Sequence, residues 1–165
     1  MPTARKIKTN PPDREWRRLL NERGFTRKYR FENSTLEPLK HLLLDIGGWA
    51  VCLPMKDVDS PHIISRGRRF PGRSISIPGA PSQCHTNSVV LWKLSKEKKL
   101  ERHQDIRICS GYALSKDGVW RQHSWCAFEE ESKIRLIETT VKRVQYFGYI
   151  LTDEEAMGFF SQLLI

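Results

Sequence analysis

The fold is decided by residues 119–140, which read VWRQHSWCAF-EEES-KIRLIETT. Two runs rich in β-branched and aromatic residues flank a short polar connector, and this pattern is typical of a β-hairpin. If Phe128 pairs with Lys133 across the connector, an antiparallel register places His123 directly opposite Glu138. The sequence therefore predicts an imidazole and a carboxylate in contact on neighbouring strands.

The flanking segments extend this hairpin into a sheet covered by helices. Further strands are expected over Ile106–Leu114 and from about Val144 to Leu151. A helix is expected from Ser82, a good N-cap residue, because apolar residues recur after it at helical spacing. Thr152 and Glu155 have the spacing of a capping box and predict a C-terminal helix.

The N-terminal half has the pattern of a mainly helical region. Residues 1–12 are basic and end in two prolines, so we expect a mobile basic arm before a single domain over residues 13–165. Helices are predicted from Asp13 to Gly24 and from Ser34 to Gly47. A short buried strand or extended segment is predicted over residues 49–53.

Five prolines in residues 54–83 argue against continuous regular structure in that stretch. The predicted fold class is therefore α+β, with a helical N-terminal half and a cysteine-bearing helix packed on a mainly antiparallel sheet of about four strands. A C-terminal helix closes the domain.

Composition indicates a globular protein with an anionic partner. The 165 residues are 39% hydrophobic and carry a formal net charge of +9, from 28 Lys and Arg against 19 Asp and Glu. This excess favours a nucleic acid, an acidic protein or another polyanion as partner. No apolar run suits a signal peptide or a membrane span, and the four cysteines form no Cys-x-x-Cys pair. We therefore expect a reduced protein of the cytoplasm that does not enter membranes.

Cys84 is the candidate nucleophile because it lies in the first turn of the expected helix. The positive end of a helix dipole and a nearby imidazolium both lower the pKa of a thiol and favour the thiolate. The surrounding residues, SQCHTN at 82–87, are too polar for a core segment and indicate a functional role. Cys52, Cys109 and Cys126 lie in apolar strands and are interpreted as buried.

A thiol, an imidazole and a carboxylate in contact can carry out nucleophilic acyl chemistry. The structural alternative for His123 and Glu138 is a half-buried ion pair, with Arg121 as another possible partner of the carboxylate. Cys84, His85, His123 and Glu138 are also groups that suit zinc, although no ligand pair has a familiar spacing.

The order of these groups resembles the papain-like cysteine peptidase superfamily in the broad sense, which includes cell-wall endopeptidases, transglutaminase-like enzymes and bacterial glutamine deamidases. There a cysteine at a helix N-terminus precedes a histidine on a strand and an acidic or amide residue on the next strand. The resemblance covers about residues 79–140 and implies a papain-like core without a cofactor. It implies Cys84 as nucleophile, His123 as base and Glu138 as orienting residue. The implied activity is that of a thiol-dependent hydrolase or acyltransferase acting on an amide bond of a peptide or protein.

Two features depart from that superfamily. Its oxyanion-binding glutamine usually lies several residues before the cysteine, whereas Gln83 is adjacent to Cys84, and its third residue is more often Asn or Asp than Glu. The backbone N–H of Cys84 is one candidate oxyanion donor, with the side chain of Gln83 or of Asn87 as the second.

Arginines in the loop before the nucleophile predict a preference for acidic or anionic substrates, because this loop is expected to border the cleft. They are Arg66, Arg68, Arg69 and Arg73.

A non-catalytic nucleic-acid-binding module is the alternative function. Basic residues between positions 5 and 30 could bind phosphates, and Trp16, Tyr29 and Phe31 lie among or beside them for stacking on bases. No known nucleic-acid recognition motif is present, and the enzyme hypothesis is favoured for that reason.

Overall fold

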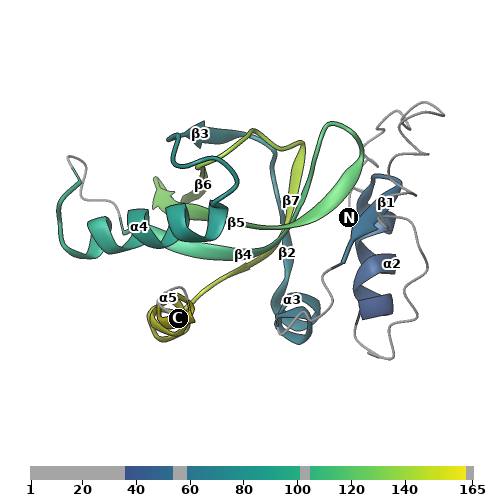
Figure 1. The fold of residues 1–165 in the computed structure, drawn as a ribbon, viewed down its shortest axis with the longest axis horizontal. Helices are drawn as coiled ribbons and strands as arrows, with labels where there is room; N and C mark the ends of the chain where they lie inside the picture. Colours follow the sequence, from purple (N-terminus) through teal and green to yellow (C-terminus); the bar gives the residue numbers. More distant parts are fainter. Residues whose placement is uncertain (1–35, 54–58, 101–104, 163–165) are drawn as a thin grey trace.

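The described part of the chain has an α+β fold in which four helices accompany a curled, mostly antiparallel sheet of seven strands that resembles half a barrel (Figure 1). The computed structural model describes residues 36–53, 59–100 and 105–162. The strands are β1 (Ala50–Cys52), β2 (Arg68–Phe70), β3 (Ser74–Ser76), β4 (Arg107–Leu114), β5 (Val119–Glu130), β6 (Lys133–Glu138) and β7 (Gln145–Ile150). The helices are α2 (Leu36–Ile46), α3 (Ser60–Arg66), α4 (Cys84–Lys96) and α5 (Asp153–Gln162).

The sheet has the order β2-β7-β4-β5-β6-β3, with β1 paired to β5 beside this path. The predicted antiparallel strands β4, β5, β6 and β7 are confirmed. The strand predicted over residues 49–53 is confirmed as β1, which is half-buried and pairs in parallel with β5. The expectation of about four sheet strands was too low, because β3 also adds a parallel pair to β6 and β2 adds an antiparallel pair to β7. Strands β2 and β3 have only three residues each and pair with partners distant in sequence, so their local pattern is weak.

The proline-rich stretch contains more regular structure than predicted. Its described part, residues 59–83, forms α3, β2 and β3. Pro61 lies at the start of α3, where a missing N–H is tolerated. The prolines therefore shorten the elements here without preventing them.

The register of the β5–β6 hairpin differs by two residues from the predicted one. Phe128 pairs with Arg135, and Glu130 pairs with Lys133. The turn contains only Glu131 and Ser132, both with positive φ (50° and 61°), as a two-residue hairpin turn of type I′ requires. His123 is therefore not directly opposite Glu138. A shift of two residues keeps the two side chains on the same face, where they are diagonal neighbours.

The two faces of the sheet carry separate apolar clusters. All four helices contribute to the cluster on one face, for example Leu39 of α2, Ile63 of α3 and Trp92 of α4. The opposite face holds a second cluster that includes Trp125 and Tyr146. Alternation along β5 places His123 on the face of Trp125, away from the helix-covered side.

The helix starts were predicted with mixed success. Helix α2 lies within the range predicted for it, and the capping box of α5 is confirmed by hydrogen bonds between Thr152 and Glu155 in both directions. Helix α4 begins at Cys84 with Gln83 as its N-cap residue, whereas Ser82 has a φ of 59° and does not cap.

The predicted basic arm and the helix expected over residues 13–24 lie outside the described residues. Within the described ranges, no helix is long and apolar enough to cross a membrane.

Candidate active site

Cys84 is held at the start of α4 by a tight turn and a side-chain clamp. In the turn Ala80–Gln83, the N–H of Gln83 donates to the carbonyl of Ala80 (3.3 Å), and Ser82 takes the left-handed conformation. The Asn87 side chain accepts from the N–H of Ala80 (3.1 Å) and donates to its carbonyl (2.8 Å). The clamp fixes the loop that leads into the candidate nucleophile.

The same loop is attached to the strand that carries Glu138. The N–H of Ile77 donates to the carbonyl of Glu138 (3.0 Å), and the N–H of Gly79 donates to that of Thr139 (2.8 Å). A Cβ at Gly79 would lie 2.4–2.6 Å from the Asn87 amide, so this approach requires glycine. The nucleophile loop and the end of β6 thus form one connected unit.

Cys84 and His123 are close enough to interact, and each group shifts the pKa of the other. Burial alone would raise the pKa of the half-buried thiol, but His123 and the backbone N–H groups of Ser124 and His85 lower it below its usual value. Burial would likewise lower the pKa of His123, which is 2% exposed, but its interactions with Cys84 and Glu138 raise it. Both shifts favour a thiolate–imidazolium pair.

Glu138 holds the other side of the imidazole. His123 Nε2 lies 2.9 Å from Glu138 Oε2, which leaves Nδ1 for the thiol. Glu138 is fully buried, and burial would raise its pKa. The hydrogen bond and charge of His123, followed by bonds from Thr140 and Tyr146, lower it to about 2. The carboxylate is therefore ionised at neutral pH.

The carboxylate of Glu138 accepts three hydrogen bonds besides that of His123. The hydroxyl of Tyr146 donates to Oε2 (2.8 Å), and the N–H and hydroxyl of Thr140 both donate to Oε1 (2.9 Å each). These bonds fix both oxygens and leave the carboxylate little freedom to rotate. The roles of Tyr146 and Thr140 could not be predicted from the sequence, because a tyrosine in a strand and a threonine after one have no distinctive spacing.

Aromatic rings and two glycines complete the surroundings of His123. Its ring is stacked on those of Trp125 and Tyr146, with centroids 6.2 Å apart in each case. Gly111 on β4 pairs directly with His123 on β5, and on its other side it pairs with Gly148 on β7. A Cβ at Gly148 would lie 2.8 Å from the Trp125 indole, so glycine makes room for that ring.

His85 faces away from the Cys84–His123–Glu138 group. Its Nδ1 lies 2.6 Å from the hydroxyl of Ser124, on the other face of β5. Burial, followed by the charge of His123, lowers the pKa of His85. Within the described ranges no group of three or more His, Cys, Asp or Glu is arranged to hold a metal ion, and the zinc alternative gains no support from the geometry.

The two side chains predicted as oxyanion donors differ in their surroundings. The amide of Asn87 is engaged by the clamp on Ala80, which gives it a positioning role. Gln83 is exposed beside Cys84, and its side chain makes no cap bond to α4. Gln83 therefore remains the candidate side-chain donor.

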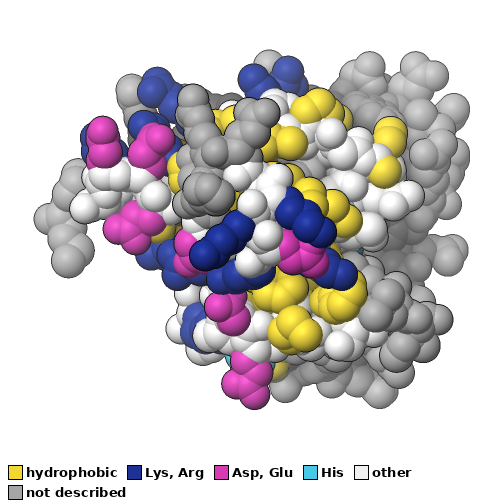
Figure 2. All heavy atoms as spheres, turned by 90° about the vertical axis from the view of Figure 1, so that its left-hand side faces the viewer, with side chains coloured by type: hydrophobic (Ala, Val, Ile, Leu, Met, Phe, Trp, Pro, Cys, Tyr) yellow, Lys and Arg dark blue, Asp and Glu magenta, His cyan; other side chains and the backbone are white. Residues whose placement is uncertain are grey.

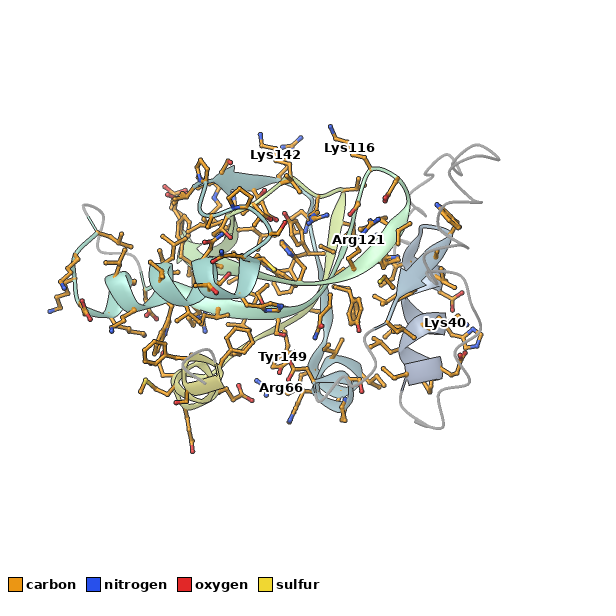
Figure 3. The ribbon with its side chains drawn as sticks, in the orientation of Figure 1. Lys40, Arg66, Lys116, Arg121, Lys142 and Tyr149 are labelled. Atoms are coloured by element: carbon orange, nitrogen blue, oxygen red, sulfur yellow. The ribbon has the colours of Figure 1, made fainter. Side chains whose placement is uncertain are left out.

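The four predicted substrate-binding arginines are spread over three places. Arg66 ends α3, where its guanidinium bonds Glu155 and lies 4.6 Å from the Tyr149 ring centroid. Arg68 and Arg69 are in β2, and Arg73 precedes β3. Figure 3 shows Arg66 and Tyr149 together on the lower side of the molecule, far from Lys116 and Lys142 at its upper edge. The role of the four arginines in substrate binding stays a prediction.

The pKa values of the other three thiols are raised, whereas that of Cys84 is lowered. Burial raises the pKa of Cys52, raises that of Cys109 well above its usual value, and raises that of Cys126 to about 12. Cys109 and Cys126 are fully buried, as predicted, whereas Cys52 is half-buried. Cys84 alone among the four combines partial exposure with a lowered pKa.

No protein-family model, curated protein or solved structure matches this chain.

Proposed function

We propose that this protein is a thiol-dependent enzyme that attacks an amide or related acyl group through a Cys84–His123–Glu138 triad on a papain-like core. The proposal is supported above all by one buried imidazole that is hydrogen-bonded to the carboxylate of pKa about 2 and interacts with a thiol at a helix start. A structural ion pair needs no partly exposed thiol on the second side of the histidine.

In the first half of the reaction, the Cys84 thiolate attacks the carbonyl carbon of the amide and a C–S bond forms. The resulting oxyanion accepts a hydrogen bond from the Cys84 backbone N–H, with the Gln83 side chain as the proposed second donor. His123 then gives its proton to the nitrogen, the C–N bond breaks, and an amine and a thioester remain.

In the second half, His123 takes a proton from the acceptor, whose oxygen or nitrogen attacks the thioester. The C–S bond breaks and the Cys84 thiolate is restored. Glu138 keeps the imidazole oriented and stabilises its charged form in both halves. Water as the acceptor gives a peptidase or deamidase, and an amine gives a transglutaminase-like acyltransferase.

Alkylation by iodoacetamide near neutral pH, followed by peptide mapping, tests the proposal. Modification is expected at Cys84, and His123→Ala should slow it strongly because the thiolate loses its cationic partner. Cys52→Ser is the matched control, since its thiol has a raised pKa and its loss should leave the labelling unchanged. Labelling spread over several cysteines, or independent of His123, would contradict the proposal.

A broad acceptor assay then separates the possible activities. Wild-type and Cys84→Ala proteins are incubated with denatured casein, with and without a fluorescent primary amine. New chain ends indicate a peptidase, ammonia without chain cleavage indicates a deamidase, and covalent incorporation of the amine indicates acyl transfer. Each of these signals should disappear in Cys84→Ala.

A further inference from the structure

A second candidate binding site lies at the end of the sheet beside the proposed triad. It is an open pocket of about 370 Å³ formed by two connections, the β4–β5 turn and the segment between β6 and β7. Its lining residues are Ser115, Lys116, Asp117, Val141, Lys142 and Arg143. We call it the basic pocket.

Both walls of the basic pocket lead directly into strands of the triad. The β4–β5 turn continues into β5, which carries His123, and the other wall follows Glu138 at the end of β6. The walls are joined by a bond from the Val144 N–H to the Leu114 carbonyl (2.8 Å) and by one from Arg143 to the Ser115 hydroxyl (2.6 Å). The pocket therefore belongs to the same rigid framework as the triad.

The second wall is also close in sequence to a residue that holds the triad carboxylate. The hydroxyl of Tyr146 donates to Glu138 Oε2 (2.8 Å), and Tyr146 follows Arg143 of the pocket by three residues. A group held in the basic pocket would thus be positioned relative to Glu138 by a short stretch of backbone.

The charge in the basic pocket is strongly positive. Lys116, Lys142 and Arg143 face a single carboxylate, Asp117, which two hydrogen bonds (3.0 and 2.7 Å) tie to Arg121. With Asp117 neutralised by Arg121, the pocket has a net charge of +3. Within the described residues, Lys116 and Lys142 form no salt bridge, and Figure 3 shows both amino groups directed to solvent at the same edge.

Among the other described lysines, Lys40, Lys96 and Lys99 have acidic partners. Lys96 at the end of α4 pairs with Asp105 and Asp153, and Lys99 pairs with Glu97. Figure 2 shows this side of the molecule, where dark blue and magenta side chains are interspersed. The basic pocket differs from that mixed surface because it brings three cations together around one carboxylate that Arg121 already holds.

We infer that the basic pocket binds a carboxylate of an acidic peptide substrate while an amide of that peptide lies at Cys84. This inference rests on the proposed function and names its substrate class. Exposed lysines and the half-buried Arg143 supply donors for a carboxylate, and Val141, 59% exposed, supplies apolar contact for a side-chain stem. The lining contains no aromatic ring on which a base could stack, so a peptide fits it better than a nucleic acid does.

Binding of a rhodamine-labelled hexaglutamate peptide, measured by fluorescence anisotropy at physiological ionic strength, tests the inference. The double variant Lys116→Glu with Lys142→Glu should weaken binding by about tenfold or more, since two attractions become repulsions. Lys98→Glu with Lys133→Glu makes the same change of net charge at exposed sites away from the pocket. This control should stay within about twofold of wild type if the pocket, and not the overall charge, holds the peptide.

Three results would overturn the inference: no binding to wild type, equal weakening in both double variants, or a pocket-dependent preference for a single-stranded oligonucleotide over hexaglutamate. Iodoacetamide labelling of Cys84 in every variant reports that the fold is intact. It also separates the two proposals, because loss of selective labelling in wild type rejects the enzyme whatever the peptide does. Retained labelling without peptide binding rejects only the acidic substrate.

Discussion

Replacing Glu138 by Gln keeps the size of the buried side chain and removes its charge. In the protein, the carboxylate accepts hydrogen bonds from His123, Tyr146 and, on its other oxygen, twice from Thr140. A glutamine oxygen can still accept both bonds from Thr140. Its NH₂ group must then face two donors, the hydroxyl of Tyr146 and the imidazolium of His123, and the imidazolium loses its stabilising charge.

The pKa of Glu138 gives the magnitude of the effect. Its value falls from 4.5 to about 2 on folding. At about 1.4 kcal/mol per pKa unit, this difference corresponds to about 3 kcal/mol of stability. Because the pKa is lower in the folded state, the contribution is complete well above pH 4.5 and is lost as the pH falls towards 2. By pH 3, about 2 kcal/mol of it should be gone.

Urea unfolding at a series of pH values between 7 and 3 measures this contribution. The free energy of unfolding of wild type should fall by about 2 kcal/mol more than that of Glu138→Gln over this range. Glu130→Gln is the matched control, because Glu130 is 42% exposed and pairs with Arg135 at the hairpin end. It should change stability by less than about 1 kcal/mol and follow the pH dependence of wild type.

Parallel pH profiles for wild type and Glu138→Gln would refute this reasoning, because they would show that the carboxylate gains no stabilisation on folding. The variant should also move the pH profile of Cys84 alkylation to higher pH. Without the carboxylate the pKa of His123 falls, so the thiolate loses its cationic partner at a lower pH and the thiol pKa rises.

Three further substitutions test the framework of the site. Tyr146→Phe removes a donor to a buried carboxylate and should lower the free energy of unfolding by about 1.5–3 kcal/mol. It should also shift the alkylation profile in the direction of Glu138→Gln but by less. Asn87→Ala removes both bonds to Ala80, should cost about 1–2 kcal/mol in urea unfolding, and should slow Cys84 alkylation. Gly148→Ala places a Cβ 2.2 Å from the Ser110 carbonyl oxygen and should lower the free energy of unfolding by at least about 1–3 kcal/mol. An unchanged free energy of unfolding would contradict this close packing.

The contact between His123 and Glu138 could be predicted from sequence although the register could not. Four polar residues separate the apolar runs, and nothing in their identity shows that Glu129 and Glu130 still belong to β5. The turn is instead made by Glu131 and Ser132, which adopt positive φ without glycine or asparagine. The prediction survived because strand side chains alternate with a period of two, so a two-residue error leaves both groups on one face.

The missed features depend on contacts between distant segments. Strands β2 and β3 are short, and each is stabilised by a partner more than fifty residues away in sequence. The same reason hid the role of Tyr146, which reaches the carboxylate only because β7 crosses the sheet beside β4. Capping residues and apolar periodicity are local signals, and they placed α2 and α5 correctly.

The contrast among the four cysteines has a consequence for how this protein would respond to oxidants. Peroxide reacts with thiolates that solvent can reach, so sulfenic acid should form first at Cys84. The protonated, enclosed sulfurs of Cys109 and Cys126 would be spared, and the core would stay intact. Mild oxidation would then inactivate the Cys84 thiol while the protein stays folded, and a reductant would restore the thiol.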